Sequence, residues 1–347
     1  GLLALADVPG NDDMDVLSRP VNYVTYEVRS TDGQPHDVEI YLEATPEWAV
    51  NEINQEVEVS TSKIGNVNYI RTGTTEQPVL KRKGDNVRID WGYFYLGSEN
   101  ANNNAMAIGD VSSMKTSFIE SGKINSEQEK ITAVMTKSMP VLAFSADLQD
   151  VSTPSEGGYV MLAYDDIESI QYFGQNLKAW WTDNGKIAFD KVLSSAASDY
   201  KKIIERCDDL DRKIYEEAVR AGGENYARLC LLAYRQCIAA HKLVKDAQGN
   251  TLFLSKENFS NGSIGTVDVT YPSAPLFLKY NPELLKGMLN PIFYYAESGK
   301  WTKPFPAHDV GTYPQANGQT YGEDMPVEES GNMLILTTAI AHVEGNA

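Results

Sequence analysis

The residues best suited to chemistry gather in the polar stretch of residues 304–332. Two adjacent glutamates, Glu328 and Glu329, follow Pro326 there. Proline is favoured at the first helical position, and carboxylates are favoured in the first turn, so these residues predict a helix start. Asn332 follows Glu329 by three positions and Glu328 by four, so its amide can reach either carboxylate. A carboxylate held by an amide at a cavity mouth can act as a general acid or base, although helix capping alone would explain the same residues.

A second polar pair, His308 and Asp309, lies upstream in the same stretch. Such a pair in a Pro-rich loop often only shapes a turn, but beside a pocket it can take part in acid–base chemistry. We expect Asp309 to act as an acid or to orient water, and His308 to orient a carboxylate. The loop that carries them shows no periodicity, and loops of this length in compact domains are usually functional or disordered. Its prolines, glycines and aromatic residues favour an ordered, packed loop.

The elements that must position these residues change in type along the chain. Period-two alternation of β-branched and aromatic residues predicts strands at residues 23–29, 38–43, 57–60, 87–96 and 141–144. Many short antiparallel strands with one wet face indicate a β-sandwich. Beyond Tyr164 apolar residues recur every three or four positions, which predicts helices at 165–181, 185–206, 211–221, 224–245, 282–298 and 327–342, with extended chain at 251–254 and 267–269. We therefore expect an α+β multidomain protein, with a β-sandwich domain in residues 1–160 and helical hairpins in residues 161–347.

The last predicted helix is apolar on every side from Met333 to Ala341. A helix that is apolar all round is normally buried. We therefore expect its first turn, with the two glutamates, to open into an interior cavity.

The composition disfavours several classes of partner. Forty-eight acidic and 30 basic residues give a net charge of −18, which repels phosphate backbones and anionic lipid, so no nucleic-acid or membrane partner is expected. No apolar run reaches the roughly 18–20 residues of a membrane span. Three cysteines without CxxC spacing give neither a disulfide framework nor a zinc motif. We expect no cofactor, because dinucleotide and phosphate-loop fingerprints are absent, and the sequence leaves a metal undetermined.

Three segments resemble one known family. They read PFPAHDVGTYPQANGQTYGEDMPVEESGN (residues 304–332), YDDIESIQYF (164–173) and LKRKGDNVRIDW (80–91). They are similar to the glutaminase A family, whose members carry a six-hairpin helical toroid, an (α/α)6 fold, after β-rich domains. The resemblance implies hydrolysis of the side-chain amide of L-glutamine, a secreted or periplasmic location, and a chain that is an internal fragment completed by the remaining parts of its parent.

Under that resemblance the catalytic carboxylates would be Glu328 or Glu329 together with Asp309, oriented by His308 and Asn332. The division between acid and base stays open. Because the toroid is shared with glycoside hydrolases, the alternative is a carbohydrate substrate, with Trp301, Tyr313 and Tyr321 as stacking platforms. Packing of the loop would explain these aromatics equally. Glutamine needs a cationic partner for its carboxylate, and the loop offers only Lys300 and Lys303. This shortage modestly favours a sugar substrate or a cation from another part of the protein. A catalytically silent fragment is the third possibility.

Overall fold

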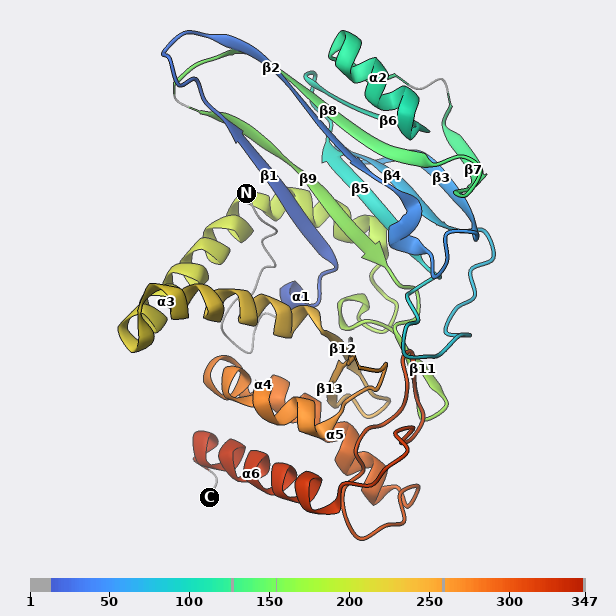
Figure 1. Cartoon of the computed structure of the whole chain (residues 1–347), viewed down its shortest axis with the longest axis vertical. Coiled ribbons are helices and arrows are strands. Elements are labelled where there is room, and N and C mark those ends of the chain that lie inside the picture. Colours follow the sequence, from blue (N-terminus) through green and yellow to red (C-terminus); the bar gives the residue numbers. More distant parts are fainter. Residues whose placement is uncertain (1–13, 126–127, 154, 258–259, 346–347) are drawn as a thin grey trace.

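The computed structural model describes residues 14–125, 128–153, 155–257 and 260–345 (Figure 1). Its first half contains two antiparallel sheets, as predicted. The six-stranded sheet has the order β1 (Val21–Val28), β9 (Glu156–Asp165), β5 (Tyr93–Glu99), β4 (Val67–Thr74), β3 (Glu56–Ile64), β7 (Lys130–Val134). The three-stranded sheet has the order β2 (His36–Ala44), β8 (Pro140–Val151), β6 (Asn104–Asp110).

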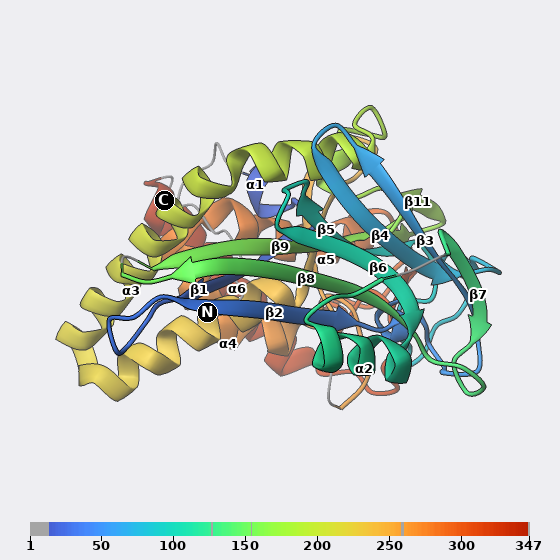
Figure 2. The same ribbon diagram turned by 90° about the horizontal axis from the view of Figure 1, so that it is seen from above.

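Alternation along the strands sorts the side chains into layers. On β5, Phe94 and Leu96 join Leu142 and Phe144 of β8 in the core between the two sheets, which makes a sandwich. Tyr95 points to the opposite face of the large sheet and packs against the helical part. The helix α2 (Val111–Ser121) covers the outer face of the small sheet (Figure 2).

The long helix α3 (Phe189–Ala239) packs its first half on the large sheet. Gly223 divides it, with φ 81° and ψ 180°, a conformation open essentially only to glycine. Beyond this kink the chain turns back, so that Tyr234 packs on Leu210 and Ile214. The break predicted between the helices at 221 and 224 is confirmed, and the two halves form a helical hairpin.

The C-terminal part packs three helices around a small hairpin. The strands β12 (His241–Lys245) and β13 (Thr251–Ser255) share one core with α4 (Val267–Tyr280), α5 (Pro282–Glu297) and α6 (Pro326–Glu344). The predicted helices at 282–298 and 327–342 are confirmed. In the described residues no helix is long and apolar enough to cross a membrane.

Five local predictions are wrong. Residues 87–92 precede β5 without forming a strand, and residues 207–210 continue α3 instead of separating two helices. Residues 165–181 form no α-helix but the strands β10 (Ile170–Tyr172) and β11 (Gln175–Leu177) and a short 3₁₀ turn, η3 (Trp180–Thr182). The turn between the strands places Phe173 and Gly174 at positive φ, and β10 pairs with β14 (Gln315–Ala316), a contact no local pattern announces. Residues 241–245 form β12 instead of continuing a helix, and residues 267–269 begin α4 instead of an extended segment, a start obscured by two prolines inside that helix.

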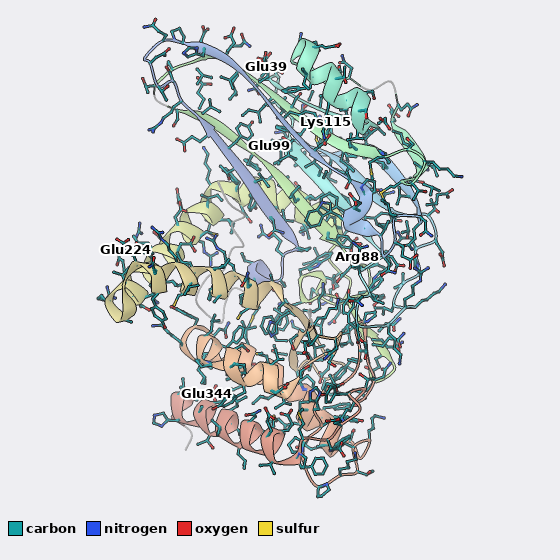
Figure 3. All side chains as sticks on the ribbon, in the orientation of Figure 1. Glu39, Arg88, Glu99, Lys115, Glu224 and Glu344 are labelled. Atoms are coloured by element: carbon teal, nitrogen blue, oxygen red, sulfur yellow. The ribbon has the colours of Figure 1, made fainter. Side chains whose placement is uncertain are left out.

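The prediction that the last helix is buried on every side is also wrong. Met333, Leu336 and Ile340 of α6 are buried, whereas Leu334 is 69% exposed and Ile335 is 54% exposed. Within the described part of the chain α6 packs on α4 and α5 with one face and lies at an edge of the molecule (Figure 1). Charged side chains such as Glu39, Lys115, Glu224 and Glu344 lie at the periphery (Figure 3).

Candidate active site

Three acid–base side chains meet where two helices begin. Asp268 lies in the first turn of α4, Glu329 in the first turn of α6, and His308 in the loop between α5 and α6. One carboxylate oxygen of Asp268, one of Glu329 and one imidazole nitrogen of His308 lie within 4.8 Å of one another. The packing of α4 on α6 brings the two helix starts together.

Glu329 is completely buried. Its Oε2 accepts a long hydrogen bond of 3.5 Å from Asn332 Nδ2, and its Oε1 has no hydrogen-bond partner among the described residues. Burial, and then the negative charge of Asp268, raise the pKa of Glu329 to about 7. An ordinary glutamate is ionised at neutral pH, so this carboxyl group is unusual in being able to carry a proton there.

Asp268 faces the same point from the other helix. Its Oδ1 lies 3.8 Å from His308 Nε2 and has no hydrogen-bond partner among the described residues, and its side chain is 31% exposed. The carboxylate is thus close to an imidazole on one side and reachable by solvent on the other. A group in this position can take a proton from water.

His308 is held from three directions. Its Nδ1 lies 3.0 Å from Asp309 Oδ2, its ring stacks on Tyr321 at a centroid distance of 4.2 Å, and its backbone N–H donates to Gln319 Oε1. Burial alone would lower the pKa of His308. The hydrogen bond with Asp309 and the negative charges of Asp309, Asp268 and Glu329 outweigh burial and raise it above its ordinary value.

Asp309 is fully buried, and its oxygens are occupied. Its Oδ1 accepts from the backbone N–H groups of Gly311 at 2.9 Å and Thr320 at 3.0 Å, and its Oδ2 accepts from the backbone N–H of Tyr321 at 3.1 Å as well as meeting His308. A carboxylate that ties its own loop together with backbone donors has little capacity left for water. Its contacts hold the loop and His308, and the roles predicted for Asp309, as an acid or in orienting water, stay predictions.

The other predicted residues separate in the structure. Glu328 is exposed on α6, so of the two glutamates only Glu329 faces the cluster, and Asn332 contacts that one. Trp301 donates through its indole N–H to Phe305 O and packs on Tyr295, and Tyr313 stacks with Trp91 of the β-rich part. These aromatic residues pack the loop, and Tyr321 backs His308.

Sequence reasoning missed Asp268. Its available signal was an acidic residue in a first helical turn, as at Glu329, but the prolines of α4 disguised the helix. Carboxylate and imidazole are also ligands for divalent metals. Two atoms that each bind one metal ion at about 2.1 Å lie at most about 4.2 Å apart. The side chains of Asp268, His308 and Glu329 could therefore hold such an ion if their ligand atoms moved slightly closer together.

The comparisons with known proteins agree with this architecture. The domain of unknown function DUF5127 matches residues 9–217, and the glutaminase A six helical-hairpin domain matches residues 223–347. The chain belongs to the glutaminase A family. The two matches meet near the kink at Gly223, and the division predicted at residues 160–161 stays a prediction.

Two curated relatives in this family are fungal. Glutaminase A of Aspergillus oryzae is 31% identical over 340 residues, which cover 95% of this chain and 48% of the relative. A probable glutaminase of Arthroderma benhamiae is 27% identical over 350 residues, covering 94% of this chain and 39% of the relative. The chain thus spans less than half the length of these relatives. A putative kojibiose phosphorylase from human microbiome superposes with a TM-score of 0.40 and 12% identity over 83% of this chain and 32% of that one, a similarity too low to bear on function.

Proposed function

We propose that this chain carries catalytic residues of a hydrolase that cleaves the side-chain amide of L-glutamine to glutamate and ammonia. The observation that carries the proposal is Glu329, a fully buried carboxyl group with one oxygen that no described residue hydrogen-bonds, set against Asp268 and His308 in a member of the glutaminase A family. The similarity to proteins named glutaminase supports this substrate class.

The two carboxyl groups suit opposite roles because their surroundings differ. In the proposed reaction a water molecule attacks the amide carbon, and Asp268, which solvent reaches, accepts the proton of that water. Glu329 enters the reaction protonated and donates its proton to the nitrogen as the C–N bond breaks. Two neighbouring carboxyl groups in different environments can divide the acid and base roles between them.

His308 is a positioning residue in this scheme. Its Nε2 lies 3.8 Å from Asp268 Oδ1, so a protonated imidazole can attract that carboxylate and hold it in place. Asp309 and Tyr321 fix its ring, and Asn332 orients Glu329.

We further propose that the remaining parts of a longer parent chain supply the other walls of the site, including a cation for the carboxylate of glutamine, because Lys303 is paired with Asp324. The expectation of a secreted or periplasmic location stays a prediction.

The spacing of the carboxylates argues against an inverting glycosidase mechanism. An inverting glycosidase needs carboxyl groups about 6.5–9.5 Å apart. The donor atoms of Asp268 and Glu329 lie within 4.8 Å of each other, and the loop aromatics are engaged in packing.

The test is ammonia release from L-glutamine, measured on this chain and on the full-length protein that contains it. Glu329→Gln and Asp268→Asn are expected to lower kcat by about 10²- to 10⁴-fold, the usual contribution of a general acid or base. Glu328→Gln, which changes the exposed neighbour on the same turn, is the matched control and should retain activity. Full ammonia release by Glu329→Gln, or release of aglycone from aryl glycosides without ammonia, would refute the proposal.

A further inference from the structure

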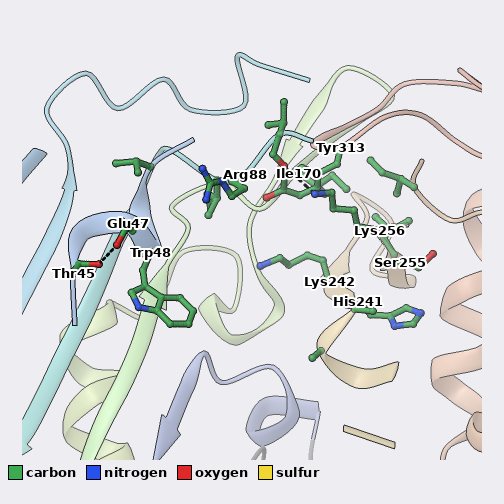
Figure 4. Close-up of a pocket in the computed structure, with 17 residues that line it drawn as sticks. Thr45, Glu47, Trp48, Arg88, Ile170, His241, Lys242, Ser255, Lys256 and Tyr313 are labelled. Atoms are coloured by element: carbon green, nitrogen blue, oxygen red, sulfur yellow. Dashed lines mark hydrogen bonds between the residues drawn. The ribbon is translucent and has the colours of Figure 1, made fainter. Parts of the chain in front are cut away.

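A cavity separate from the carboxylate cluster lies where the β-rich and helical parts meet (Figure 4). Its volume is about 690 Å³, within the range of small-molecule sites. One wall comes from the 3₁₀ turn η2 (Pro46–Ala49) and the segment 87–89, and the other from the start of β12 and the end of β13. Asp268, His308 and Glu329 are not among the described residues that line it.

The charge of this lining is opposite to that of the protein. Arg88, Lys242 and Lys256 face the cavity, against one acidic residue, Glu47, although the chain as a whole has 48 acidic and 30 basic residues. Lys242 is neutralised by Asp166, with Nζ 2.7 Å from Oδ2. The other two cations remain, so the cavity is locally positive, which favours anions.

Lys256 is the centre of this positive region. Its ammonium donates to the carbonyl oxygen of Val87 at 3.0 Å and lies 4.8 Å from the centroid of the Tyr313 ring, and the described residues place no carboxylate in ion-pair contact with it. Burial lowers the pKa of Lys256. A partly desolvated ammonium without a counter-ion is unfavourable, and a bound anion would relieve that cost while using donors that the Val87 carbonyl leaves free.

Two further groups complete a binding surface. Arg88 donates through Nη2 to the carbonyl oxygen of Asn51 at 2.7 Å, an uncharged partner that leaves its other donors available. Trp48 stacks one face on Phe94 at 5.7 Å and is 61% exposed, so an aromatic surface stands at the edge of the cavity (Figure 4).

We propose that this cavity binds a small organic anion, whose carboxylate or phosphate group is held by Lys256 and Arg88 and whose apolar part rests on Trp48. The site is distinct from the proposed catalytic centre and does not depend on the proposed reaction. It would place a ligand between the sandwich and the helical hairpins, in contact with both.

Isothermal titration with sodium benzoate, L-glutamate and inorganic phosphate tests the proposal, with sodium chloride at equal ionic strength as the reference. Saturable binding is expected for at least one probe, and which probes bind separates a carboxylate from a phosphate ligand. Lys256→Gln and Arg88→Gln should each weaken binding at least tenfold, because each removes a charge-assisted contact. Trp48→Ala should weaken binding of benzoate more than that of phosphate.

Three comparisons keep the result interpretable. Lys256→Arg preserves the charge and should retain affinity within about threefold, which separates loss of charge from loss of folding. Lys137→Gln, an exposed lysine on a turn outside the cavity, is the matched control. Glu329→Gln should leave the binding unchanged, which separates this site from the catalytic one. Absence of saturable binding in the native protein would overturn the proposal. So would an affinity of Lys256→Gln and Arg88→Gln that equals the affinity of the native protein.

Discussion

Glu329→Gln is expected to lower the proposed activity strongly and yet stabilise the protein above neutral pH. The substitution keeps the shape of the side chain and removes its charge. The pKa of Glu329 is raised from 4.5 to about 7 in the folded chain, chiefly by burial. At about 1.4 kcal/mol per pKa unit, this difference corresponds to about 3 kcal/mol.

The sign of the effect follows from proton binding. An unfolded chain releases the proton of this glutamate near pH 4.5, whereas the folded chain keeps it until about pH 7. Between these values the folded state binds more protons, so the free energy of unfolding falls as the pH rises. The loss of stability caused by ionising the buried Glu329 is absent below about pH 4.5 and complete above about pH 7. The Glu329→Gln variant has no charge to acquire and does not lose this stability.

Urea unfolding at pH 5, 6, 7 and 8 measures this difference. The free energy of unfolding of Glu329→Gln relative to the unmodified chain should increase across the series, approaching about 3 kcal/mol at pH 8. The exposed neighbour provides the control, since Glu328→Gln should show no comparable trend. A difference between Glu329→Gln and the unmodified chain that stays constant from pH 5 to pH 8, or that shrinks, would refute the assignment of Glu329 as a buried, protonatable carboxyl group.

Three further outcomes are expected from the loop and from α6. Asp309→Asn should lower the free energy of unfolding by more than about 2 kcal/mol, because an amide cannot accept from three backbone N–H groups. Urea unfolding measures this change, and an unchanged free energy of unfolding would contradict the structural role of Asp309. Gly311→Ala should destabilise the loop, since φ is 148° there and a Cβ atom would lie 2.2 Å from Gln315 O; a melting temperature equal to that of the unmodified chain would argue against this backbone geometry. Leu334→Ala should change the free energy of unfolding by less than about 0.5 kcal/mol, whereas Leu336→Ala on the buried face should cost about 2–5 kcal/mol, so equal effects in urea would contradict the one-sided packing of α6.

The family resemblance and part of the candidate site were readable from the sequence. The alternation that places Phe94 and Tyr95 on opposite faces is local, so several strands of the sandwich could be predicted without the fold, whereas β4, β6, β7 and β9 were missed. The start of α6 was equally local, because Pro326 and the acidic first turn satisfy the unpaired N–H groups and the dipole of a helix. These features depend on residues within one turn or one strand of each other.

Tertiary packing decided which of the candidate residues meet. Glu328 and Glu329 are equivalent by local rules, and only the packing of α6 on α4 buries one and exposes the other. The same packing brings in Asp268, which lies 61 residues before Glu329 and whose helix start two prolines disguised. The sequence determines what each residue can do. The association of segments far apart along the chain determines which carboxylates share a desolvated site, because burial and neighbouring charge, unlike strand alternation or helix capping, are properties of the assembled fold.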